Sequence, residues 1–161
     1  MIAWKLQEKF VDKVLKGNSV FWDHNSETGE VAFGDGFHFF VVSDERMFID
    51  LPKLQKSCSN LNKVSLLNSF HKMDLNTYTT FTLFSMARDK GVIHKFETAN
   101  NEEVWIGEGY LKEINWFKNK EYWMISAAEK AAGKSPVLFR IDEDDLKAVI
   151  LPVRVGDENG I

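Results

Sequence analysis

The strongest constraint on the fold is that short apolar segments follow one another with only turn residues between them. Residues 78–88 and 92–98 are rich in Thr, Phe, Val and Ile, and Asp89-Lys90-Gly91 alone separates them. Gly34-Asp35-Gly36 is a second such turn. A connection this short joins antiparallel strands, because parallel neighbours need a crossover of a dozen or more residues. We therefore predict an α+β fold on an antiparallel sheet, and not the parallel sheet of dinucleotide-binding proteins.

The periodicity of apolar residues predicts two longer helices and a series of strands. Trp4, Leu6 and Phe10 recur at helical spacing, so a helix is expected over residues 4–16, and a second over 109–117. The expected strands are residues 20–23, 31–33, 37–42, 78–88, 92–98, 104–106, 122–126, 137–141 and 147–153. The weaker pattern between them predicts a strand at 47–51 and short helices at 52–56 and 64–70.

One order of elements occurs twice along the chain. A helix followed by three strands is expected in residues 4–42 and again in 109–153, with little residue identity between the two copies. The 161 residues suit one domain, expected over 1–155, and the polar, glycine-containing residues 156–161 are predicted to form a flexible tail.

The composition limits the cellular compartment and the classes of partner that we expect for this protein. The single cysteine, Cys58, excludes an internal disulfide and a zinc site with several thiolates. No basic-then-apolar leader is seen near the N-terminus, and no apolar run is long enough to cross a bilayer. We therefore expect a cytoplasmic protein with no membrane partner. The net charge of −4 differs from that of a strongly basic nucleic-acid binder, although binding depends on a local basic face.

Motifs for catalysis are scarce. Asp35 and His38 lie three residues apart beside a glycine turn, and His24 and Glu27 could join them across the neighbouring hairpin as a small enzyme or metal site. The favoured interpretation is that His38 is a packed or edge strand residue, because the remaining ligands of a metal site are missing. The chain also lacks a Gly-x-Ser-x-Gly elbow and a phosphate-binding loop. We expect no catalytic residue, metal or cofactor.

A lysine stripe on the first helix is the main charged feature. Its members fall within an arc of about 80° on a helical wheel: Lys5, Lys9, Lys13 and Lys16. One interpretation is a solvated face with ion pairs to the neighbouring Glu8 and Asp12. The other is a set of contacts to phosphates that do not read bases.

The C-terminal part resembles the end of bacterial DNA sliding clamps. The match is carried by Lys134-Ser135-Pro136-Val137-Leu138-Phe139, a short acidic turn, and Ala148-Val149-Ile150-Leu151-Pro152-Val153-Arg154-Val155. Clamp chains close with a Pro-Val-Leu strand, a turn and a final strand that ends in a Met-Pro-Met-Arg-Leu-like run. The resemblance implies one clamp-like domain with two helices on one face of an antiparallel sheet. Short clamp-like proteins of phages and mobile elements are similar in this respect.

The resemblance implies two sites. Clamp helices face DNA, so Lys5, Lys9, Lys13 and Lys16 would contact phosphates. The clamp pocket for partner peptides uses the last strand, which implies the candidates Leu151, Pro152, Val153 and Arg154; plain core packing is the alternative for Leu151 and Val153. A clamp chain has three such domains and this chain has room for one, so a ring would need a homo-oligomer.

Three hypotheses follow, in order of preference. The first is a non-catalytic DNA-associated or replication-accessory binding module that contacts double-stranded DNA. The second is a phage or mobile-element interaction or assembly module without DNA binding, which would use sheet edges. The third is a small enzyme with a site near Asp35 and His38.

Overall fold

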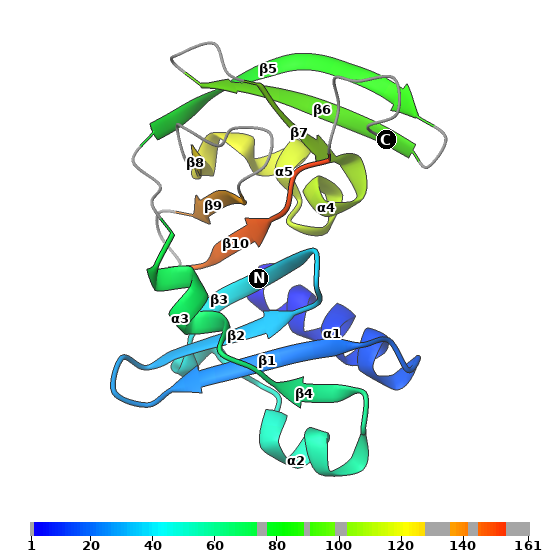
Figure 1. The fold of residues 1–161 in the computed structure, drawn as a ribbon, viewed down its shortest axis with the longest axis vertical. Helices are drawn as coiled ribbons and strands as arrows, with labels where there is room; N and C mark the ends of the chain where they lie inside the picture. The colour runs from blue at the N-terminus through cyan, green and yellow to red at the C-terminus, as the bar shows by residue number, and fades with distance from the viewer. Residues whose placement is uncertain are drawn as a thin grey trace. The chain divides into compact units, whose positions relative to one another are not determined.

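The fold is described from a computed structural model for residues 2–73, 77–88, 91–98, 103–127, 136–141 and 145–153. The chain divides into two compact units, each described by itself. The first comprises Met1–Met73 with Glu143–Ala148, and the second comprises Asp74–Asp142 with Val149–Ile161. Both combine helices with strands, which confirms the predicted α+β class (Figure 1).

The first unit is built on four strands in the order β4-β1-β2-β3. Its elements are α1 (Ile2–Leu15), β1 (Val20–Asn25), β2 (Glu30–Gly34), β3 (His38–Ser43), η1 (Asp44–Arg46), α2 (Leu51–Ser57), β4 (Leu61–Lys63) and α3 (Leu66–His71). The pairs β1–β2 and β2–β3 are antiparallel hairpins, as predicted. Strand β4 pairs with β1 in parallel, so the sheet of this unit is mixed, with two antiparallel pairs and one parallel pair.

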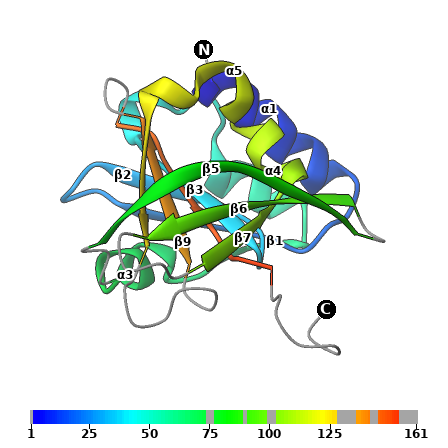
Figure 2. The ribbon, with the colours of Figure 1, turned by 90° about the horizontal axis from the view of Figure 1, so that it is seen from above.

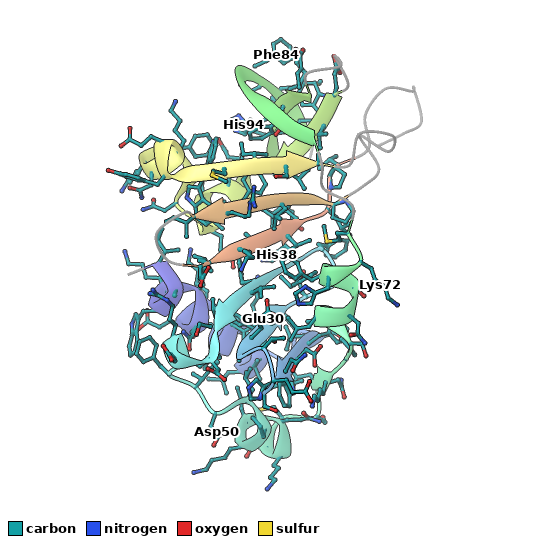
Figure 3. All side chains as sticks on the ribbon, turned by 90° about the vertical axis from the view of Figure 1, so that its left-hand side faces the viewer. Glu30, His38, Asp50, Lys72, Phe84 and His94 are labelled. Carbon is teal, nitrogen blue, oxygen red and sulfur yellow. The ribbon has the colours of Figure 1, made fainter. Side chains whose placement is uncertain are left out.

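Helices cover both faces of β2 and β3. On one face, Phe10 of α1 packs edge-on against Phe33, with ring centroids 5.2 Å apart. On the other, Leu67 of α3 lies in a buried cluster with Ala32 and Val41. Figure 3 shows α1 and α3 on opposite sides of these strands. Burial on both faces explains why β3 is a continuous apolar run without alternation.

The second unit carries a longer meander. Its elements are β5 (Thr77–Arg88), β6 (Gly91–Thr98), β7 (Glu103–Gly107), α4 (Glu108–Glu113), α5 (Trp116–Asn119), η2 (Lys120–Tyr122), β8 (Trp123–Ala127) and β9 (Val137–Ile141). The strand order is β9-β8-β5-β6-β7, and β5 and β6 form a long curved ribbon (Figure 2). Strand β10 (Lys147–Ile150) is divided, because Lys147 and Ala148 belong to the first unit and the rest to the second.

Three aromatic side chains form the centre of the second unit. Trp116, Phe96 and Phe139 pack edge-to-face, with ring centroids 5.7–5.8 Å apart in every pair. All three are almost fully buried, as are Leu111 and Ile114 of the preceding helical region. Aromatic pairs of this geometry contribute about 0.5–1.5 kcal/mol each beyond the burial of area.

Several predictions of secondary structure are corrected. Residues 47–51 are not a strand; the chain there leads into α2, whose N-terminus is capped by the Asp50 side chain accepting from Lys53 N at 3.1 Å. The helix expected over 109–117 is split, because Asn115 adopts a left-handed backbone with φ 59°. The last strand ends at Ile150 and not at Val153.

The repeated element order is confirmed. A helix precedes three strands in α1-β1-β2-β3, and the short helices α4, α5 and η2 precede β8-β9-β10. The two copies belong largely to different units. The placement of two helices on one sheet face and the single domain over 1–155 therefore stay predictions. The expected tail, residues 156–161, lies outside the described residues.

Candidate functional site

Three of the four stripe lysines are exposed. Helix α1 buries Leu6, Phe10 and Val14 and leaves Lys5 and Lys9 exposed on its outer side. Lys16 follows the last residue of α1 and is also exposed; its N–H still donates to Asp12 O at 3.0 Å, in the helical pattern. Within the described part of the chain, none of these three ammonium groups lies within 4.0 Å of a carboxylate. The predicted ion pairs with Glu8 and Asp12 are thus not formed, and the three positive charges face solvent.

Lys13 is different, because it joins a buried polar network. Its Nζ lies 3.7 Å from Asp35 Oδ2 and 3.4 Å from His38 Nε2. The Lys13 side chain is only 29% exposed. Its charge is therefore already matched by a carboxylate within the first unit, and Lys13 contributes less to a phosphate-binding face than its three neighbours.

Asp35 organises the turn between β2 and β3. Its Oδ1 accepts from Phe37 N at 2.7 Å, His38 N at 3.0 Å and the His38 ring Nδ1 at 3.1 Å. Burial alone would raise the pKa of the Asp35 carboxyl, but the hydrogen bond and attraction of the His38 ring and these two backbone amides hold that pKa well below its usual range. When the His38 ring is neutral and donates Nδ1–H to Asp35, its Nε2 is the acceptor for Lys13.

The turn is also tight in space. A Cβ atom at Gly34 would lie 2.3 Å from the carbonyl oxygen of His38 and 2.4 Å from Phe39 Cα, so only glycine fits. His38 itself is 3% exposed. The Asp35–His38–Lys13 network therefore ties α1 to the β2–β3 turn, which agrees with the packed-residue interpretation of His38.

His24 does not join Asp35 and His38. It pairs with Val31 in the β1–β2 ladder, whereas the opposite end of that ladder pairs Phe21 with Gly34, next to Asp35. Instead, His24 Nε2 lies 3.4 Å from Asp44 Oδ2. The other two described histidine pairs are His71–Glu30 at 2.7 Å and His94–Glu108 at 3.3 Å. No group of three potential metal ligands exists among the described side chains.

The residues proposed for partner peptides follow β10. Leu151 is 39% exposed, while Pro152 and Val153 are half-buried. Val153 N donates to Trp105 O at 2.7 Å, in an isolated bridge at the edge strand β7. Arg154 lies outside the described residues. The sequence predicts these residues as the end of a longer last strand. In the structure they follow β10, and Val153 contacts β7.

The sequence did not predict an exposed aromatic pair, which joins α1 to the segment between η1 and α2. Trp4 and Phe48 are 44% and 54% exposed, and their rings contact edge-on with centroids 4.4 Å apart. They line a groove of about 440 Å³ that also includes Val11 and Ile49. Helical spacing alone predicts Trp4 as a core residue, and the strand predicted over residues 47–51, which would include Phe48, does not form.

The comparisons with known proteins provide no relative. No protein-family model matches the chain, no curated protein matches it, and no solved structure is similar to it. Among the helices that the structure describes, none is long and apolar enough to span a bilayer. The sliding-clamp resemblance therefore rests on the C-terminal residues that suggested it.

Proposed function

We propose that this chain is a non-catalytic DNA-associated binding module, which contacts phosphates through Lys5 and Lys9 of α1 and through Lys16, the residue that follows this helix. The observation that carries the proposal is that these three lysines are exposed on one helix side and have no carboxylate partner among the described residues. A helix rises about 1.5 Å per residue, so Lys9 lies about 6 Å along the axis from Lys5 and about 10 Å from Lys16. Such spacing allows separate phosphate contacts along one groove edge.

The charge pattern predicts weak, sequence-independent binding. Glu8 and Asp12 flank the three lysines and are exposed. Their repulsion of phosphates limits the affinity, and lysine contacts to phosphates carry no base information. A non-specific dissociation constant of about 10⁻⁴ to 10⁻⁶ M at physiological salt is expected. The C-terminal resemblance supports the same class of function, as one clamp-like domain whose ring would need several copies.

The salt dependence of DNA binding tests the proposal. Fluorescence anisotropy of a labelled duplex is measured between about 25 and 200 mM NaCl, and three phosphate contacts predict a log–log slope of about −2.7. The triple variant Lys5→Gln/Lys9→Gln/Lys16→Gln should lose at least about tenfold in affinity at low salt, and the slope should fall toward zero.

A matched variant controls for overall charge. Lys53, Lys56 and Lys72 are also exposed in the first unit, and their triple change to Gln alters the net charge equally. It should change affinity by less than about twofold, because charges beyond about 10 Å are screened at 0.1 M salt. Equal losses in both triple variants, or no binding at the lowest salt, would contradict the proposal.

The exposed Trp4–Phe48 pair favours a second candidate, an assembly module without DNA binding. Tryptophan is enriched at the energetic centres of protein interfaces, and Trp4 of this pair lies on α1, the helix that carries Lys5 and Lys9. Duplex binding and solution mass, measured on the same samples, decide between the two functions. A chain that ignores the duplex but has a solution mass above 18.5 kDa, reduced to 18.5 kDa by Trp4→Ser, would support self-association in place of DNA binding.

A further inference from the structure

Strand β5 leaves its neighbour β8 after a very short contact. The two strands pair only at Thr77 with Ala127 and at Tyr78 with Ser126. From Thr79 onward, β5 pairs with β6 instead. Strand β8 continues its ladder with β9 at residues 123–125. The two strands therefore fork at Thr79, and within the described part of the chain β8 has no strand partner on its β5 side beyond the fork.

A cavity of about 520 Å³ lies at this fork. It is lined by Thr79 of β5, Trp116 of α5, and Trp123, Met124 and Ile125 of β8. Helix η2 adds the exposed, oppositely charged Lys120 and Glu121. Pockets for small molecules have volumes of about 300–1,000 Å³ and mostly apolar walls with a few polar groups. This cavity has that size and that composition, and its rim carries no net charge.

Two buried polar atoms of the lining residues lack a hydrogen-bond partner among the described groups. They are Thr79 Oγ1 and Trp123 Nε1, and both are shielded from solvent. Trp123 is 94% buried, since only 6% of its surface is exposed. Buried polar groups in native proteins are nearly always paired, and an unpaired one costs about 1–3 kcal/mol. Both atoms belong to side chains that line one cavity, so a ligand that enters it and displaces the atoms covering them could bring an acceptor to either.

We propose that the fork cavity binds a planar, uncharged aromatic molecule that carries a hydrogen-bond acceptor. The indole rings and the Met124 side chain provide apolar and stacking contacts. The Trp123 N–H is a donor only, and the Thr79 hydroxyl can donate as well, so both select a ligand with an acceptor. The opposite charges of Lys120 and Glu121 favour neither an anion nor a cation.

This inference is independent of the DNA proposal. Every residue that lines the fork cavity belongs to the second unit, whereas Lys5, Lys9 and Lys16 belong to the first. Variants of either site can therefore fail without affecting the test of the other.

Quinoline and naphthalene form a matched pair of probes, because they share size and planarity and only quinoline has a ring-nitrogen acceptor. The chain has five tryptophans, so ¹H–¹⁵N spectra of the full chain report five indole N–H groups. Quinoline at about pH 7.5, where its nitrogen is unprotonated, should shift the Trp123 signal saturably. Naphthalene should bind about threefold to tenfold more weakly, the value of one hydrogen bond. The Trp22 signal should not move, because its N–H already donates to Gln55 Oε1 at 2.6 Å.

Two substitutions remove the polar groups: Thr79→Val keeps the shape of the side chain, and Trp123→Phe also replaces the indole by a smaller ring. Thr79→Val and Trp123→Phe should each lower the quinoline affinity toward that of naphthalene, while Ser85→Ala, on the exposed side of the same strand β5, should leave both affinities unchanged. Because Thr79→Val is isosteric, it keeps the test valid if Trp123→Phe folds poorly. Equal affinities for the two probes, no saturable shift up to about 5 mM quinoline, or a shift confined to Trp4 would overturn the proposal.

Discussion

Trp22 and Trp123 are a matched pair of buried indoles with different environments. Each is 6% exposed on a β-strand, one in each unit. Trp22 Nε1 donates to Gln55 Oε1 at 2.6 Å, and Lys63 Nζ lies 5.2 Å above its ring. Trp123 Nε1 has no hydrogen-bond partner among the described groups. Equal burial therefore does not imply an equal role, because the partner of the N–H decides whether the side chain only stabilises the fold.

The buried polar side chains of the first unit follow the pattern of Trp22. Gln7 is 1% exposed; its Nε2 donates to Arg46 O at 2.9 Å, and its Oε1 accepts from Phe48 N at 2.7 Å. His38 is held between Asp35 and Lys13. These groups hold segments without regular structure against α1. In the second unit, by contrast, the unpaired groups gather at the β5–β8 fork, which is why we place a ligand there.

The largest expected effect is the loss of the Gln7 network. Gln7→Leu keeps most of the volume but leaves Phe48 N and Arg46 O without this partner, and should lower the free energy of unfolding by about 2–3 kcal/mol. Urea unfolding followed by tryptophan fluorescence measures the change. The same substitution at the exposed neighbour, Glu8→Leu, should change it by less than about 0.5 kcal/mol. If Gln7→Leu lowered the free energy of unfolding no more than the control Glu8→Leu does, the network would contribute no net stability.

An intermediate effect with a defined pH dependence is expected at Asp35. Because the folded pKa of this carboxyl lies below its ordinary value, the stability that its charge provides is fully present above about pH 4 and is lost as the pH falls below it. Asp35→Asn should therefore be less stable than the native chain by about 1–2 kcal/mol at neutral pH, and the difference should shrink as the pH approaches 3.

Denaturant titrations between about pH 7 and pH 3 measure that convergence. The exposed Asp12 provides a control on α1, since Asp12→Asn should change stability by less than about 0.5 kcal/mol at neutral pH. A difference between native and Asp35→Asn chains that stayed constant with pH would mean that the carboxylate charge is not what stabilises the turn.

The smallest effect isolates the indole N–H itself. Trp22→Phe and Trp123→Phe remove the same atoms from equally buried sites, so the lost packing largely cancels in their comparison. Trp22→Phe also leaves Gln55 Oε1 without this donor, and should be the more destabilising by about 1 kcal/mol. Parallel thermal unfolding of the two variants measures the difference. If Trp123→Phe were the more destabilising, Trp123 would have a structural partner and the fork cavity would lose its main donor.

The local part of the fold was predictable from sequence. The elements that the predictions missed have identifiable physical causes. The antiparallel pairs β1–β2 and β5–β6 follow from turn residues between apolar runs, a purely local signal. Strand β4 was missed because its three residues, of which only Leu61 is buried, form a strand only by pairing with β1. The break at Asn115 was missed because a single left-handed residue leaves the helical periodicity on either side nearly intact.

The candidate sites were only partly visible in the sequence. The spacing of Lys5, Lys9, Lys13 and Lys16 on one helical face was predictable, since an α-helix fixes it. That Lys13 is held by Asp35 and His38 was not, because the 25 residues from Lys13 to His38 carry no signal of contact.

The sequence by itself determined the α+β class, the hairpins and the lysine face of α1, because each depends on residues within a few positions of one another. The tertiary structure decided which charges are already paired, which histidine meets which carboxylate, and where two strands separate around a cavity. Those properties depend on segments far apart in the chain, such as Lys13 with Asp35 and Thr79 with Trp123. Their proximity is set by packing and strand pairing, which no local pattern records.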